Sequence, residues 1–214
     1  MQNILSNIGH ACGKVNLIKR AMDATRKAMS MEHDYAQVLL QGTAYGNLGM
    51  FKEAIKAYKR AVRVEPNDSE AYCNLGNAYM KINRFREAID AYKEAVRIRP
   101  DDARTYYNLG NAYGKLNKYR EAISSIKRAI NIRPSMSEAH KNLGVYYGML
   151  GMYKEAKESL MLAVKIEPKN INARYNLAVV CMELQDRVSA LKEFSILKKI
   201  SPRVAEKLSK MIHS

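Results

Sequence analysis

Apolar and small residues recur in this chain with a period of 34 positions. The octapeptide Tyr-Cys-Asn-Leu-Gly-Asn-Ala-Tyr at 72–79 returns at 106–113, and looser copies stand at 140–147 and 174–181. Each period contains two stretches with apolar residues at helical spacing, and a short turn separates them. A helical hairpin of this kind can bury its apolar face only against neighbouring hairpins. The pattern therefore predicts an all-α array of stacked helical hairpins.

The prolines mark where each period ends, because a proline cannot continue a helix. They stand 34 positions apart, at Pro66, Pro100, Pro134, Pro168 and Pro202. Five hairpins are expected, at 35–68, 69–102, 103–136, 137–170 and 171–204. A terminal helix over 203–214 is expected to cover the last apolar face. Residues 1–34 follow the pattern more loosely and predict a degenerate hairpin. The sequence does not decide whether this hairpin is docked, free or disordered.

Glycine recurs inside the first helix of each period, at Gly42, Gly76, Gly110 and Gly144. A glycine in a helix interior costs about 1 kcal/mol relative to alanine. Its repetition predicts that a neighbouring helix comes too close for a methyl group. We expect the space beside the small residues, these glycines and the recurring alanines, to be filled by the tyrosines at Tyr45, Tyr79, Tyr113 and Tyr147.

The order Leu-Gly-x-x-Tyr, Ala, large residue, Ala, Pro resembles the signature of the tetratricopeptide repeat family. The middle three hairpins match it closely. The last departs at Ala178, Cys181 and Leu197, and the first has Gln41 where Leu is usual. The resemblance implies a right-handed superhelical solenoid that binds other proteins and has no enzymatic activity.

Candidate catalytic and metal-binding groups are sparse. The four histidines have no partner at metal-ligand spacing, and the three cysteines form no Cys-x-x-Cys pair. This cysteine usage fits a reducing compartment. No stretch approaches the ~18 apolar residues of a membrane-spanning helix, and no secretory-signal pattern is visible. The sequence predicts a cytoplasmic protein with no catalytic residue, metal or cofactor.

In this family the first helices line a concave groove that binds extended peptides or helices. An asparagine side chain can donate to and accept from a peptide backbone, so a row of them suits such a partner. The alternative is that these amides bond only the backbone of neighbouring helices. A clamp for a C-terminal carboxylate is disfavoured, because Leu39 and Thr43 stand where it needs Lys and Asn. Carried over by position, the groove residues are Asn74, Asn77, Lys81, Arg104, Tyr107, Asn108, Asn111, Lys115, Lys141, Asn142, Tyr175 and Asn176.

The chain is strongly basic, with 36 Lys and Arg against 21 Asp and Glu and a net charge of +15. Such an excess indicates an acidic partner surface, or it serves solubility alone. Each basic residue near anionic lipid contributes about 1 kcal/mol. No nucleic acid is expected, because the tyrosines do not alternate with the basic residues as a stacking platform requires. The recurring basic positions on the second helices predict a convex stripe of Lys59, Arg60, Arg63, Lys93, Arg97, Lys127, Arg128 and Lys165.

A narrower resemblance lies before the clear repeats. Asp23-Ala-Thr-Arg26-Lys-Ala28-Met-Ser30, with Asp34 and Gln37-Val38 after it, resembles the N-terminal region of the magnetosome-associated tetratricopeptide proteins of magnetotactic bacteria. It implies a self-assembling scaffold on the cytoplasmic face of the magnetosome membrane. Its partners would be further copies of itself and magnetosome membrane proteins or the anionic membrane surface.

In that resemblance, the N-terminal hairpin of one copy docks into the groove of the next. The apolar residues that would mediate this contact are Ile4, Ile8, Val15, Ile18 and Met22. The alternative function is a monomeric adaptor that binds an extended peptide or protein tail in its groove.

Overall fold

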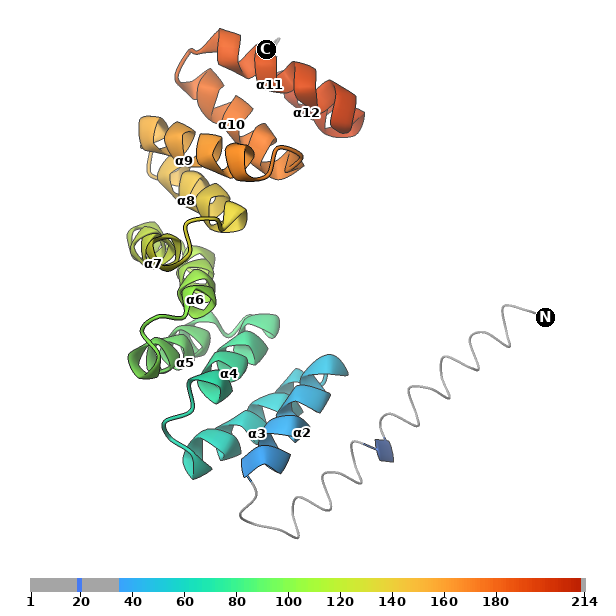
Figure 1. Cartoon of the computed structure of the whole chain (residues 1–214). Helices are drawn as coiled ribbons and strands as arrows, with labels where there is room; N and C mark the ends of the chain where they lie inside the picture. The colour runs from blue at the N-terminus through green and yellow to red at the C-terminus, as the bar shows by residue number, and fades with distance from the viewer. Residues whose placement is uncertain (1–18, 21–34, 213–214) are drawn as a thin grey trace, which may run out of the picture. The chain divides into compact units, whose positions relative to one another are not determined.

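The computed structural model describes residues 19–20 and 35–212, and every regular element in 35–212 is an α-helix (Figure 1). The predicted all-α class is confirmed. The predicted oligomerisation residues Ile4, Ile8, Val15, Ile18 and Met22 lie outside the described residues. The chain divides into two compact units, one ending at Pro100 and one beginning at Asp101.

The described part of the first unit consists of two helical hairpins. Each hairpin pairs a first helix with a second helix, and α3 also packs against α4. The hairpins are α2 (Tyr35–Asn47) with α3 (Phe51–Val64), and α4 (Ser69–Lys81) with α5 (Phe85–Ile98).

The second unit contains three hairpins and a final helix, α12 (Pro202–Ile212). Consecutive hairpins stack, since α7 packs on α8 and α9 packs on α10. Helix α12 packs on both helices of the last hairpin, where Ala178, Leu197, Ala205 and Leu208 form a buried cluster. The hairpins are α6 (Ala103–Lys115) with α7 (Tyr119–Ile132), α8 (Ser137–Met149) with α9 (Tyr153–Ile166), and α10 (Ile171–Glu183) with α11 (Arg187–Ile200).

The turn inside each hairpin contains one residue in the left-handed conformation. The residue after it bonds back into the first helix, as where the Arg84 N–H donates to the Tyr79 carbonyl at 3.0 Å. This Schellman arrangement satisfies carbonyls that the helix end would otherwise leave unpaired. The left-handed residues are Gly49 (φ 75°), Asn83 (φ 60°), Asn117 (φ 57°), Gly151 (φ 72°) and Gln185 (φ 57°).

Polar caps begin most of the first helices, two residues after a proline. The Asp68 carboxylate accepts from the Glu70 N–H at 2.7 Å, and Asp102 caps α6 in the same way. Asn170 caps α10 by accepting from the Ala173 N–H at 3.0 Å. An oxygen at this position satisfies a free N–H of the first turn. Proline and cap together therefore determine where each of these helices starts.

Close approach of the two helices of a hairpin is centred on the recurring glycines. A Cβ built on Gly76 would lie 2.5 Å from the ring of Tyr92, and one on Gly144 would lie 2.5 Å from Leu160 Cγ. Tyr58 and Ile126 stand in the same relation to Gly42 and Gly110. The prediction of a neighbour too close for a methyl group is confirmed.

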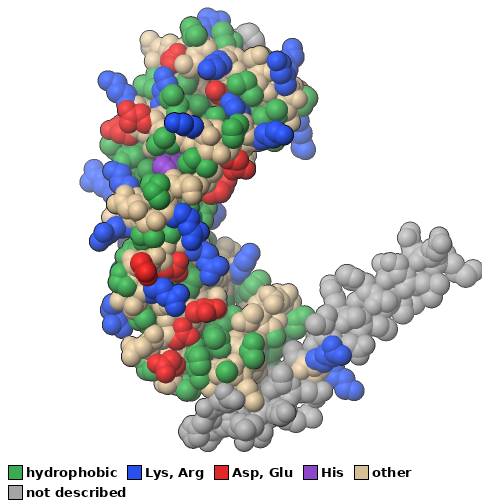
Figure 2. Space-filling view, viewed as in Figure 1, with side chains coloured by type: hydrophobic (Ala, Val, Ile, Leu, Met, Phe, Trp, Pro, Cys, Tyr) green, Lys and Arg blue, Asp and Glu red, His purple; other side chains and the backbone are tan. Residues whose placement is uncertain are grey.

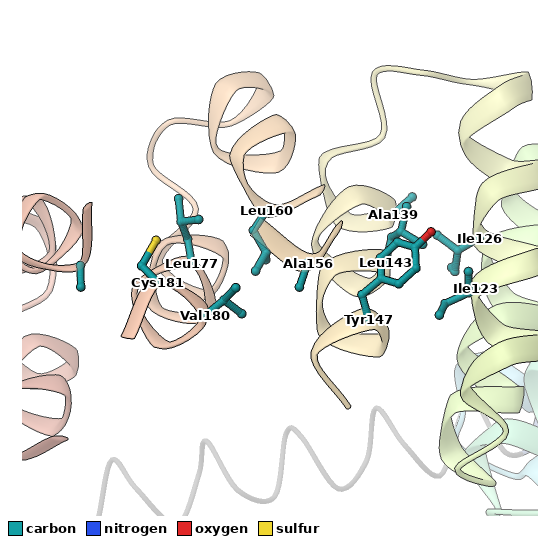
Figure 3. Packing of buried hydrophobic residues seen from close by; sticks show 11 residues of the cluster. Ile123, Ile126, Ala139, Leu143, Tyr147, Ala156, Leu160, Leu177, Val180 and Cys181 are labelled. Atoms are coloured by element: carbon teal, nitrogen blue, oxygen red, sulfur yellow. The ribbon is translucent and has the colours of Figure 1, made fainter. Parts of the chain in front are cut away.

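The prediction that Tyr45, Tyr79, Tyr113 and Tyr147 fill the space beside the glycines is wrong. The filling residue comes from the second helix of the same hairpin, because a glycine exposes its own helix backbone toward that helix. Tyr79 and Tyr147 are instead buried core residues. Figure 3 shows Tyr147 and Leu143 of α8 beside Ile123 and Ile126 of α7.

Two glycines of α8 allow this packing to be tested. Replacing Gly144 by Ala places a methyl against Leu160 and 3.0 Å from the Ala156 carbonyl oxygen. We expect the free energy of unfolding to fall by about 1–3 kcal/mol, the cost of overpacking. Gly148→Ala is the matched control, since its Cβ would have Val180 Cγ2 no nearer than 4.0 Å.

The control should raise the free energy of unfolding by up to about 1 kcal/mol through helix propensity. Urea titration followed by circular dichroism measures both variants. Equal effects of the two substitutions would show that close packing at Gly144 is not the reason for its glycine.

Candidate functional site

The predicted groove residues all lie on the first helices of the hairpins. In the first unit Asn74, Asn77 and Lys81 lie on α4. In the second unit the structure brings residues of α6 and α8 together, since the Asn142 amide donates to Asn111 Oδ1 at 2.7 Å and to Tyr107 Oη at 3.2 Å. The remaining members are Arg104, Asn108 and Lys115 on α6, Lys141 on α8, and Tyr175 and Asn176 on α10.

Two of the asparagines accept hydrogen bonds from tyrosine hydroxyls, one of a buried ring and one of a partly buried ring. Tyr92, which is 1% exposed, donates to Asn77 Oδ1 at 2.7 Å, and Tyr146 donates to Asn111 Oδ1 at 3.2 Å. Burial raises the pKa of the Tyr92 phenol, and it raises the pKa of Tyr146 to about 12 with help from the nearby Tyr107 and Tyr119. A buried hydroxyl without a partner is costly, so these two asparagines have a structural role. Both side-chain oxygens accept from another side chain.

Asn74 and Asn176 differ from these two. Both are half-buried, and within residues 35–212 neither side chain makes a hydrogen bond. Their amides can therefore bond an incoming chain. The basic residues of the first helices also differ in their surroundings. Lys81, Arg104 and Lys115 are exposed, whereas Lys141 pairs with Glu138.

A pocket of about 260 Å³ lies between α8 and α10, the first helices of two stacked hairpins. Of the predicted groove residues, Asn176 lines it. Its other side chains are mostly apolar and stand where this copy departs from the repeat, as at Val145, whose counterparts are Asn77 and Asn111. The pocket could have been predicted from these departures from the repeat. Looking for residues that recur does not detect them. The lining residues are Gly144, Val145, Gly148, Met149, Tyr153, Leu160, Asn176, Val179, Val180 and Glu183.

The basic series lies on the second helices α3, α5, α7 and α9. All its members are exposed except Arg60, which is half-buried. Lys59 and Lys127 extend over the rings of Tyr79 and Tyr147, at 5.9 and 5.5 Å from the ring centroids, and Arg97 pairs with Glu94 at 2.8 Å. On the face shown in Figure 2, basic side chains lie among acidic and apolar ones.

The series is interrupted on α9. Met161 and Leu162 occupy the positions that Lys127 and Arg128 hold one period earlier. They are 52% and 46% exposed. In the second unit the basic series therefore consists of Lys127 and Arg128 on α7 and Lys165 on α9, with the exposed apolar pair between them along the chain.

Two ion pairs fasten the last hairpin. Arg174 and Glu193 are both buried and meet at 2.5 Å, which joins α10 to α11. Lys157 of α9 meets Asp186 at 2.6 Å at the start of α11. The Lys157 ammonium, together with hydrogen bonds from Ser189, holds the pKa of the Asp186 carboxyl well below its usual range. The hairpin most divergent in sequence thus has one ion pair between its own helices and one to the preceding hairpin.

The described residues hold neither a metal-ligand cluster nor a membrane-spanning helix. Across 35–212, no cluster of three or more His, Cys, Asp or Glu side chains could hold a metal ion. None of the described helices has the length and apolar character needed to cross a membrane. Cys73 and Cys181 are buried thiols, and burial raises the pKa of Cys181.

Family models match most of the helical array. A model described as TPR repeat matches residues 42–83 and 76–117, and models described as Tetratricopeptide repeat match 103–136 and 137–170. Together they span 42–170, which is over half of the chain. No match was found among curated proteins.

Solved structures share the fold. A crystal structure of MamA protein is 27% identical, with a TM-score of 0.75 over 80% of this chain and 94% of that one. A second MamA crystal structure is 28% identical, with a TM-score of 0.71 over 79% and 95%. YrrB, described as a TPR protein with an unusual peptide-binding site, is 22% identical, with a TM-score of 0.76 over 89% and 99%.

The repeated hairpins, the matched models and the shared fold agree. A TPR fold is a scaffold for protein interaction. The chain belongs to the tetratricopeptide repeat family and resembles MamA within it.

Proposed function

We propose that this chain is a non-enzymatic scaffold that assembles with copies of itself and coats the cytoplasmic face of a magnetosome membrane. The observation that carries the proposal is the similarity to MamA, at 27% identity over nearly the whole MamA chain. The resemblance of residues 23–38 to the magnetosome-associated proteins supports the same assignment. A scaffold of this kind acts by presenting surfaces, which agrees with an array of hairpins.

Self-assembly would use residues 1–34 of one copy as the segment that enters the groove of the next. The apolar residues Ile4, Ile8, Val15, Ile18 and Met22 supply a face that a groove can bury. The unbonded amides of Asn74 and Asn176 supply donors and acceptors for it. Contacts of this head-to-tail kind do not close easily and produce large assemblies.

Membrane association would use the basic series of the second helices. Seven of its eight members are exposed, and at about 1 kcal/mol per basic residue near anionic lipid a few suffice for reversible binding. The exposed pair Met161 and Leu162 adds apolar surface beside Lys165 on α9. An acidic membrane protein would be recognised through the same charges.

A monomeric adaptor is the second candidate. The pocket between α8 and α10 favours it, because a preformed apolar recess suits a side chain of a separate partner. An adaptor would bind a peptide there without forming large particles. Particle size therefore separates the two candidates.

Assembly is tested by acidic substitution in the N-terminal segment. Ile8→Asp with Ile18→Asp should convert large particles to monomers, because two carboxylates would have to be buried in the groove. Multi-angle light scattering of the full chain gives the particle mass. The matched control, Asn7→Asp with Asn16→Asp, adds the same charge at polar positions and should keep the large particles. Large particles in both variants, or monomers in the parent chain, would contradict the self-assembly proposal.

Membrane binding is tested by charge removal on the second helices. Lys93→Gln, Lys127→Gln and Lys165→Gln together should weaken binding to vesicles that contain phosphatidylserine. Three charges at about 1 kcal/mol each correspond to roughly a hundredfold loss. Co-sedimentation with anionic and neutral vesicles measures it.

The control removes the same charge from the first helices, with Lys81→Gln, Arg104→Gln and Lys115→Gln. This variant should keep most of the vesicle binding if the second helices form the contact. Equal losses would indicate that net charge, rather than the basic series, determines binding. Oligonucleotide binding that exceeds vesicle binding at matched salt would favour a nucleic-acid partner instead.

A further inference from the structure

The junction of α6 and α8 shows how one tyrosine fills the space between two first helices. Tyr146 of α8 lies so close over Gly114 of α6 that a Cβ there would overlap its ring. The ring stacks on Tyr119, with centroids 6.1 Å apart and an interplanar angle of 27°. The hydroxyl donates to Asn111 at 3.2 Å. Gly114, which has no side chain, the ring of Tyr119 and the acceptor Asn111 together hold this tyrosine in place.

The junction of α8 and α10 keeps two of these features one period later. Gly148 is the counterpart of Gly114, and Tyr153 is the counterpart of Tyr119. Val180 stands in place of Tyr146, however, and its nearest atom is 4.0 Å from a Cβ built on Gly148. Figure 3 shows Val180 and Leu177 of α10 on the side that faces Leu160 of α9. The missing ring leaves the pocket of about 260 Å³.

The hydroxyl acceptor is missing together with the ring. Val145 stands where Asn111 stands one period earlier, and it lines the pocket. A phenol bound there would lose the acceptor that Tyr146 has. A phenyl ring, in contrast, leaves no group unsatisfied. Since an apolar cavity of roughly 150 Å³ can hold benzene, the pocket has room for one phenyl ring stacked on Tyr153.

The rim of the pocket is acidic and carries one unbonded amide. Glu183 is exposed at the end of α10, where the earlier first helices have Lys81, Lys115 and Met149. Within 35–212 this carboxylate makes no ion pair. The Asn176 side chain beside it can bond the main chain of a bound peptide. A basic residue next to the inserted ring would complement this rim.

We propose that the α8/α10 pocket binds a phenylalanine side chain of a partner protein, presented on a peptide segment with Lys or Arg beside it. Phe occupies the place that Tyr146 occupies in the preceding junction, Asn176 bonds the peptide backbone, and Glu183 pairs with the basic neighbour. The bound Phe does not come from residues 1–34, because that segment contains no Phe, and Asn176 is the one pocket residue that the self-assembly proposal also uses. Failure of one proposal therefore leaves the other in place.

The test uses the full chain and a fluorescein-labelled peptide with a Lys-Phe-Lys core flanked by Gly and Ser. Fluorescence anisotropy compares it with peptides in which Phe is replaced by Tyr or Ala. Burying one phenyl ring should favour the Phe peptide over the Ala peptide by about tenfold to a hundredfold. The Tyr peptide should bind more weakly than the Phe peptide.

A double variant, Val180→Tyr with Val145→Asn, is designed to fill the pocket with a tyrosine ring of the chain itself. This pair rebuilds the Tyr146–Asn111 arrangement at the second junction, so the variant should fold and should lose its preference for Phe over Ala. Thermal unfolding checks its stability. The exposed Glu183→Lys provides a second variant that leaves the packing untouched, and it should prefer a Glu-Phe-Glu core to Lys-Phe-Lys.

Equal affinity for the Phe and Ala peptides would overturn the proposal, as would an unchanged preference in the double variant. Tighter binding of the Tyr peptide would show that another acceptor serves the hydroxyl and would reject the assignment to Phe. If the Glu183→Lys variant still prefers the Lys-Phe-Lys peptide, Glu183 does not pair with a basic residue beside the bound Phe. A synthetic peptide of residues 1–34 that competes with the Phe peptide would assign the pocket to self-assembly instead.

Discussion

The close approach of the two helices in each hairpin is the constraint on which the rest of the structure depends. At Gly76 and Gly144 the neighbouring side chain occupies the volume that a Cβ would need. The hairpin is therefore a tightly packed unit, and stacking such units buries the alanines between them. The helix ends follow from this packing, because a left-handed turn residue must let the second helix return against the first.

The sequence predicted the features of the fold that depend on residue identity. Proline spacing and the repeated Gly indicated helical hairpins, because few residues can replace a helix stop or a missing Cβ. The residue opposite each glycine could not be predicted, because shape rather than identity is required there. Tyr92, Ile126 and Leu160 all fill the same kind of space. The left-handed turn was also hidden, since Gly, Asn and Gln share that position.

The asparagines show why a repeated residue does not by itself reveal a binding site. Asn77 and Asn111 both accept from a tyrosine hydroxyl, but Tyr92 lies on the second helix of the same hairpin and Tyr146 lies on the next first helix. Nothing in the 34-residue period relates those two donors. Asn142 and Asn176 hold the same position of the repeat, yet the Asn142 amide donates to Asn111 and Tyr107 whereas the Asn176 amide is unbonded within the described chain. Only the side-chain geometry separates the two roles.

Departures from the repeat are informative when two residues that contact each other change together. Losing Asn111 alone would leave the hydroxyl of Tyr146 without its acceptor, which costs about 1–3 kcal/mol for a buried group. At the next junction the ring and the acceptor are absent together, as Val180 and Val145, so no tyrosine hydroxyl is left without an acceptor there. The remaining cost is unfilled apolar volume, which an incoming apolar ring can recover. An array can therefore acquire a recess between two first helices without weakening the hairpins on either side.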